Sequence, residues 1–132
     1  MNNTAARWIR IVVLAEGVYW LLTGLALLLL PRLFYNSVGD FGVYNQHYMG
    51  DAGAFAAGLG LGLIIAYRDP VRHRALIAIA VIASLIHVAN HLYDDFLSGE
   101  GFPRHFLLES LPLLGLALLL AAAWYWSRKA DA

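Results

Sequence analysis

Four long apolar segments constrain this chain more than any other feature. A helix needs roughly 20 mostly apolar residues to cross about 30 Å of hydrocarbon, and segments at about residues 8–30, 47–67, 75–96 and 105–126 meet that requirement. With 61% hydrophobic and only 14% charged residues, the chain has too few polar side chains to cover a water-facing surface. The sequence therefore predicts an all-α membrane protein, an antiparallel four-helix transmembrane bundle that forms a single domain over residues 1–132.

The basic residues predict the orientation of this bundle. If the N-terminus is cytoplasmic, seven of the nine Lys and Arg residues lie on the cytoplasmic side, and two, Arg32 and Arg104, lie outside. An excess of positive charge in short cytoplasmic loops is the usual topological signal. Both ends of the chain are therefore expected in the cytoplasm, with the longest loop, residues 31–46, on the outer side.

Composition also removes several classes of function. The formal net charge is zero, which gives no support for a nucleic-acid partner. The chain has no cysteine, so disulfides, thiolate metal sites and thiol catalysis are excluded. Membrane lipid is the expected environment, and the sequence leaves open a homo-oligomer or a larger membrane complex.

Ionisable residues within the predicted spans point to a site. Such residues are costly in hydrocarbon and usually face the interior of a bundle or a wet cavity. Three predicted helices each carry a pair spaced four residues apart, which places both members on one helix face: His47 with Asp51, His87 with His91, and His105 with Glu109. At about 1.5 Å rise per residue, Asp51, His91 and Glu109 all fall roughly 8–10 Å from the helix midpoints toward the outer surface.

The first hypothesis is a metal site that faces the periplasm. Imidazole and carboxylate side chains that project inward from several helices bind metal ions such as Zn, Fe, Mn or Cu. The predicted ligands are His47, Asp51, His87, His91 and Glu109. A haem with axial histidines from this set or His105 ranks below a metal ion, because the carboxylate neighbours suit a cation better. The alternative is a structural cluster in which these side chains hydrogen-bond to one another.

Glu16 is a further acidic residue well inside an apolar run. It falls slightly to the cytoplasmic side of the first span's midpoint, roughly 12–15 Å below the level of Asp51. With His87 near the midplane, Glu16 is a predicted station of a proton relay. The alternative is a structural hydrogen bond to a neighbouring helix.

Small residues mark one face of the second predicted span. Gly50, Ala54, Gly58 and Gly62 recur at a spacing of four. Such a ridge lets another helix approach closely, so this face is predicted to pack inside the bundle. Since Asp51 and His47 flank the ridge, they are expected to point into the packed interior.

Two motifs resemble a known group of proteins: the segment from Tyr44 to Ala54, which contains His47-x-x-x-Asp51, and His87-Val88-Ala89-Asn90-His91. They resemble small four-helix bacterial membrane proteins loosely grouped as DoxX-like, in which these motifs recur in the second and third helices. The resemblance implies His47, Asp51, His87 and His91 as signature positions, and a bacterial cytoplasmic (inner) membrane. Some members are described as subunits of membrane oxidoreductase systems, but the group has no settled activity.

Three functions remain open on the sequence alone. The first is metal binding at the periplasm-facing site, with a redox role as one option. The second is a non-catalytic accessory subunit of a larger membrane complex, whose polar cluster is structural. The third is a small transporter or proton relay that uses Glu16 and His87. Whether the protein is an enzyme is left open.

Overall fold

The computed structural model describes residues 3–38, 42–98 and 104–129. Within these ranges every regular element is a helix and no strand is present. In chain order the elements are α1 (Asn3–Leu29), α2 (Pro31–Ser37), α3 (Gln46–Ala66), α4 (Arg74–Tyr93), the π-helix η1 (Asp94–Ser98), the π-helix η2 (Phe106–Ser110) and α5 (Leu111–Lys129).

Four helical segments are long and apolar enough to cross a membrane, as the sequence predicted. They are Asn3–Leu29, Gln46–Ala66, Arg74–Phe96 and Phe106–Lys129, the last two including the π-helical turns. Their bounds lie within a few residues of the predicted ones, except that the first begins five residues earlier, at Asn3 instead of Trp8. The chain is thus an all-helical protein with the four spans of a multi-pass membrane protein.

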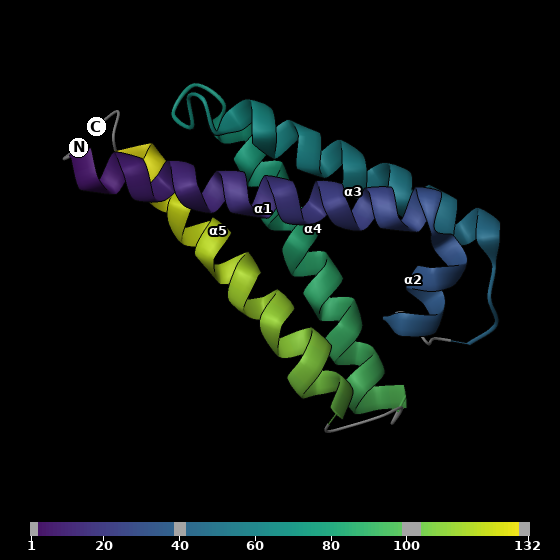
Figure 1. The fold of residues 1–132 in the computed structure, drawn as a ribbon. Helices are drawn as coiled ribbons and strands as arrows, with labels where there is room; N and C mark the ends of the chain where they lie inside the picture. The colour runs from purple at the N-terminus through teal and green to yellow at the C-terminus, as the bar shows by residue number, and fades with distance from the viewer. Residues whose placement is uncertain (1–2, 39–41, 99–103, 130–132) are drawn as a thin grey trace.

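The four spans associate as two pairs. Figure 1 shows α1 beside α3 and α4 beside α5, with both chain termini at the same end of the molecule. The pairs meet at this end and diverge toward the other. The structure therefore differs from a bundle of evenly packed parallel rods, because α3 and α4–α5 are far apart at the diverging end.

An apolar cluster holds the pairs together where they meet. It is built from buried residues of all four spans: Ile9, Val13, Leu63, Ala66, Ile77, Ala80, Val81, Leu120 and Ala123. The rings of Trp8 and Trp126, from α1 and α5, lie edge to face with centroids 5.0 Å apart at the same end. In lipid the contacts are stabilised by close packing more than by exclusion of water, so this cluster fixes how the pairs cross.

Glycines bring α1 and α3 into backbone contact. A Cβ placed on Gly24 would lie 2.3 Å from the Ala57 nitrogen, and one on Gly60 would lie 2.3 Å from the Leu21 nitrogen. Any side chain at these positions would overlap backbone atoms. Gly53 is also closely packed, since a Cβ on this residue would lie 2.9 Å from the Gly24 oxygen.

The prediction that the face with Gly50, Ala54, Gly58 and Gly62 packs inside the bundle is therefore wrong. A Cβ on Gly50, Gly58 or Gly62 would meet no atom within 4 Å among the described residues, so this face is open. The helix carries a second stripe of small residues, which includes Gly53 and Gly60, and that stripe meets the glycines of α1.

The segment predicted as a long outer loop contains the short helix α2. Pro31 begins it, as expected for a residue whose fixed φ suits the first helical position. The Arg32 guanidinium lies 4.3 Å from the centre of the Tyr44 ring, which ties α2 to the segment before α3. Residues 39–41 lie outside the described part of the chain.

Candidate functional site

The structure places His47 and Asp51 on the first turns of α3, at the diverging end. The His47 Nε2 and Asp51 Oδ2 atoms are 3.5 Å apart, and the side chains are 89% and 63% exposed. Both side chains are exposed, contrary to the expectation that they face the packed interior. The end of α3 that carries this pair diverges from α4 (Figure 1).

The five predicted metal ligands are not brought together. Among the described residues, no group of three or more His, Asp or Glu side chains is arranged to hold a metal ion. His91 and Glu109 do approach each other from α4 and η2, with Nδ1 and Oε2 3.9 Å apart. Two donors fall short of the three or four protein ligands that most bound transition metals require. Metal binding therefore stays a prediction.

A ladder of polar side chains does form along α4. Its outer step is the His91–Glu109 pair, whose side chains are 27% and 35% exposed. One turn deeper, the rings of His87 and His91 lie edge to face with centroids 4.7 Å apart. The Trp20 ring of α1 then follows, 5.6 Å from the His87 ring. We call Glu109, His91, His87, Trp20 and Glu16 the polar ladder.

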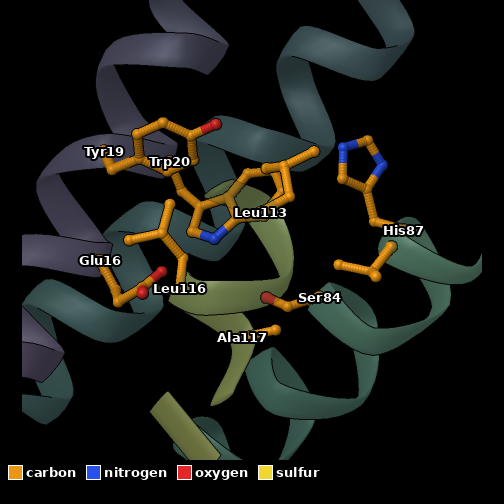
Figure 2. A pocket seen from close by; sticks show the side chains of 9 residues that line it. Glu16, Tyr19, Trp20, Ser84, His87, Leu113, Leu116 and Ala117 are labelled. Carbon is orange, nitrogen blue, oxygen red and sulfur yellow. The ribbon is translucent and has the colours of Figure 1, made fainter. Parts of the chain in front are cut away.

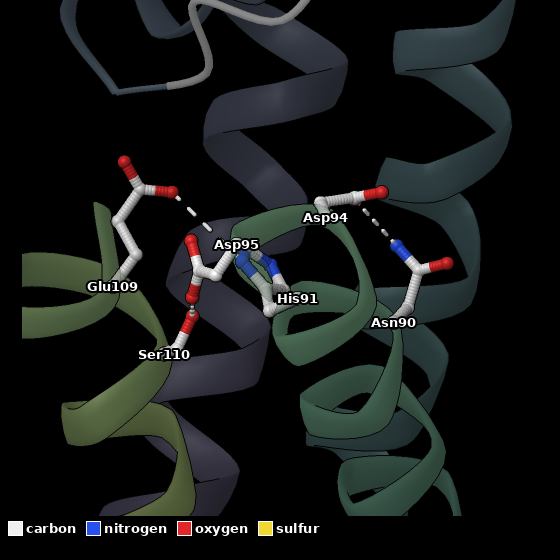
Figure 3. Close-up of polar contacts among 6 residues, drawn as sticks. All are labelled: Asn90, His91, Asp94, Asp95, Glu109 and Ser110. Carbon is white, nitrogen blue, oxygen red and sulfur yellow. Dashed lines mark hydrogen bonds and ion pairs between the residues drawn. The ribbon is translucent and has the colours of Figure 1, made fainter. Parts of the chain in front are cut away.

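Hydrogen bonds fix the outer end of this ladder, as Figure 3 shows. The buried Ser110 hydroxyl donates to the Asp95 carboxylate across the η1–η2 junction. The Asn90 amide donates to Asp94 Oδ2 over 3.2 Å on the adjacent face. His91 and Glu109 lie beside these bonds, so the turns that carry them are held together by polar contacts as well as by packing.

The π-helical turn η2 has a local cause. Pro112 has no backbone N–H, so it cannot bond to the carbonyl of Leu108, four residues earlier. The Leu111 N–H donates to the Phe106 carbonyl, which closes the wider π turn just before the proline. Such turns occur often at functional sites, and here the turn carries Glu109 toward α4.

The inner end of the ladder is a narrow recess between α1, α4 and α5. It is lined by Glu16, Tyr19, Trp20, Ser84, His87, Val88, Leu113, Leu116 and Ala117. Glu16 and Ser84 are almost completely buried, with 3% and 4% of their surfaces exposed. Figure 2 shows the Glu16 carboxylate, the Trp20 indole nitrogen and the Ser84 hydroxyl all directed into the recess.

Three buried polar atoms of this recess lack a hydrogen-bond partner among the described residues. They are Glu16 Oε1, Trp20 Nε1 and Ser84 Oγ. Leaving a buried polar group unpaired costs about 1–3 kcal/mol, and more for a charged group. The predicted structural hydrogen bond of Glu16 is therefore not formed by Oε1 among the described residues.

Below the recess the interior becomes apolar. Glu16 is the last polar member of the ladder, and the cluster around Val13, Leu63 and Leu120 lies between it and the end where the helices meet. The polar side chains of the ladder thus lie between the diverging end and Glu16, and none of its members lies beyond Glu16.

Four of the five members of the polar ladder were predicted from the sequence, but the position of Trp20 between His87 and Glu16 was not. Glu16, His87, His91 and Glu109 were all predicted as site residues, from their charge within apolar runs. Trp20 was missed because a tryptophan in a membrane helix gives no signal of its own. Trp20 lies four residues after Glu16 on the same face of α1, and the crossing of α1 over α4 and α5 brings both beside Ser84 and His87.

These features define the class of protein: a multi-pass α-helical membrane protein with polar side chains buried among its spans. No protein-family model, curated protein or solved structure matches the chain. The DoxX-like resemblance and the bacterial inner membrane therefore stay predictions.

Proposed function

We propose that the protein carries protons across the membrane from its outer side, as a small proton transporter. Glu16 is the group that binds and releases the proton, and Glu109, His91 and His87 pass it inward. The observation that carries this proposal is the sequence of contacts from the His91–Glu109 pair to the His87 ring, next to the buried carboxyl of Glu16.

The chemistry of the ladder suits proton transfer. Imidazole binds a proton on one nitrogen and releases one from the other, and His is the side chain that most often carries protons near neutral pH. Chains of Asp, Glu and His within membrane spans are the usual proton relays of pumps and transporters. In this protein such a chain begins at the diverging end, where His91 and Glu109 retain exposed surface.

The apolar cluster favours a transporter over an open channel. A channel needs a continuous polar route, whereas the residues between Glu16 and the meeting end of the helices are apolar. A proton bound at Glu16 therefore reaches the other side only after the helix pairs rearrange. The same cluster would limit proton leakage across the membrane while Glu16 exchanges protons with the outer side.

The proposal is tested by proton flux into liposomes that contain the purified protein and an internal pH-sensitive dye. A potassium gradient with valinomycin supplies the driving force. We expect Glu16→Gln to abolish the protein-dependent flux, because the amide cannot bind a proton in the same range. His91→Phe should slow it by about tenfold or more, since a positioned acid–base group typically contributes at least that much.

Asp51→Asn is the matched control for this experiment. Asp51 also lies at the diverging end, but it is on α3, off the ladder, and its ion-pair partner His47 belongs to the same helix. Its variant should keep the wild-type flux. An unchanged flux in Glu16→Gln, or a wild-type flux no greater than that of empty liposomes, would contradict the proposal.

A further inference from the structure

The recess around Glu16 offers a set of hydrogen-bonding atoms that match one oxygen ligand. The indole Nε1–H of Trp20 and the hydroxyl of Ser84 are donors, and Oε1 of Glu16 is an acceptor; all three lack a partner among the described residues. An oxygen that accepts two hydrogen bonds and donates one would satisfy all three atoms together. This is the bonding capacity of a hydroxyl group or of water.

We infer that a buried water molecule binds between Glu16, Trp20 and Ser84 and bridges His87 to the Glu16 carboxyl. Buried waters in proteins typically make about three hydrogen bonds to polar groups that would otherwise be unpaired. The Ser84 hydroxyl can rotate, so when His87 carries a proton on the nitrogen nearest the recess, the water would accept from the His87 N–H and donate its second hydrogen to the Ser84 oxygen; His87 lines the same recess. The existence of the site does not depend on the proposed function, but its role in proton transfer rests on it.

The size of the recess argues for water over a larger hydroxyl compound. The recess formed by the described residues has no open interior space in this conformation, so even water requires a small shift of a side chain. His87 is on the exposed side of the recess, so its ring can shift slightly, still beside the water, without disturbing the buried cluster. A bulky alcohol would have to displace Leu113 or Leu116, which close the recess from α5.

The pattern of donors and acceptors argues against a cation. The Trp20 N–H is directed into the recess (Figure 2), and its positive end would repel an ammonium group or a metal ion. The other lining residues of α4 and α5 next to it are Val88, Leu113, Leu116 and Ala117, none of which offers side-chain oxygens. A neutral oxygen ligand fits both facts.

The water would connect His87 to Glu16 within the polar ladder. Glu16 Oε1 makes no hydrogen bond to His87 or any other described residue. With water between them, His87 gives a proton to the water oxygen as that water gives one of its own protons to Glu16. One N–H bond breaks, one O–H bond forms on the carboxylate, and the water is regenerated.

The site is tested by nuclear magnetic resonance of protein labelled with ¹⁵N-tryptophan in lipid nanodiscs. The chain has four tryptophans, and the Trp20→Phe variant identifies the Trp20 indole signal by its loss. We expect a nuclear Overhauser cross-peak between the Trp20 Nε1–H and water, measured with the lipid deuterated. Ser84→Ala removes one of the bonding groups and should abolish or strongly weaken that cross-peak.

Ser127→Ala is the matched control, because Ser127 is equally buried but its hydroxyl donates to the Trp124 carbonyl, away from the recess. It should leave the Trp20 cross-peak unchanged. Absence of the cross-peak in the wild-type protein would overturn the inference. Cross-peaks to the methylene protons of added 1-octanol in place of water would also overturn it, because they assign the site to a membrane-soluble alcohol.

The two proposals fail in different ways. A Trp20–water cross-peak together with an unchanged flux in Glu16→Gln supports the water site and contradicts the proton-transfer function. A missing cross-peak together with a flux that depends on Glu16 contradicts the water site and leaves the function supported.

Discussion

At the scale of single residues, the meeting of His91 with Glu109 has two chemical readings. An imidazole and a carboxylate 3.9 Å apart form either a step in proton transfer or part of a metal site. The neighbouring residues His87 and Asp95 decide between proton transfer and metal binding. His87 contributes a ring 4.7 Å away by edge-to-face contact, and Asp95 is already engaged by Ser110. Neither adds the third donor that a metal ion would require.

We therefore expect the purified protein to hold well under one equivalent of Zn, Fe, Mn or Cu when it is prepared without chelators. Elemental analysis by plasma mass spectrometry measures this directly. The small amount that remains should be the same in His91→Ala, because adventitious metal does not depend on that residue. A stoichiometric metal that is lost in His91→Ala would establish the metal site and contradict the relay.

At the scale of helices, the pairing of α1 with α3 depends on glycine. Gly17 and Gly24 of α1 lie seven residues apart, and so do Gly53 and Gly60 of α3, so the backbones touch at two levels two turns apart. Close approach of this kind is what stabilises helix pairs in lipid, where burial of apolar surface gives little driving force.

Gly60→Leu should break this pairing, because its Cβ would overlap backbone atoms of Leu21 that cannot move aside. Overpacking usually costs about 1–3 kcal/mol, and a clash with backbone should exceed that range. Unfolding in mixed micelles of lipid and sodium dodecyl sulfate measures the loss of stability. Gly58→Leu is the control, since its Cβ meets nothing within 4 Å among the described residues, and an equal loss there would refute the assigned face.

The same helices show why the packing face could not be predicted from the sequence. The positions of the spans follow from local hydropathy, and all four were predicted to within a few residues except at the start of α1. Helix α3 has two stripes of small residues, and the sequence of α3 alone does not decide which of them packs. That depends on which stripe fits against Gly17 and Gly24 of α1.

At the scale of the whole molecule, divergence of the helix pairs decides which polar residues meet. The rise per residue gives the depth of a side chain along its own helix, and it predicts that Asp51, His91 and Glu109 lie at one level. It does not give the distance between side chains on different helices. Because the pairs diverge (Figure 1), Asp51 stays with His47 while His91 meets Glu109.

The two ends of the molecule thus differ in chemistry. One end is closed by the apolar cluster and by the paired rings of Trp8 and Trp126, with Arg128 and Lys129 over aromatic rings at its rim. At the other end the helix pairs diverge, α2 lies between them (Figure 1), and the His91–Glu109 pair of α4 and η2 is partly exposed. If the closed end is cytoplasmic, as the basic residues predict, the ladder opens to the outside.

Infrared difference spectroscopy during a pH step tests most directly whether protons reach Glu16 through the ladder. Carboxylic-acid C=O bands report protonation of single side chains in membrane films of the protein. A band that is absent in Glu16→Gln should respond to the pH step in the wild-type protein, and in His91→Phe it should appear with the same amplitude but more slowly. No Glu16-dependent band, or a band whose rate is unchanged in His91→Phe, would contradict the relay.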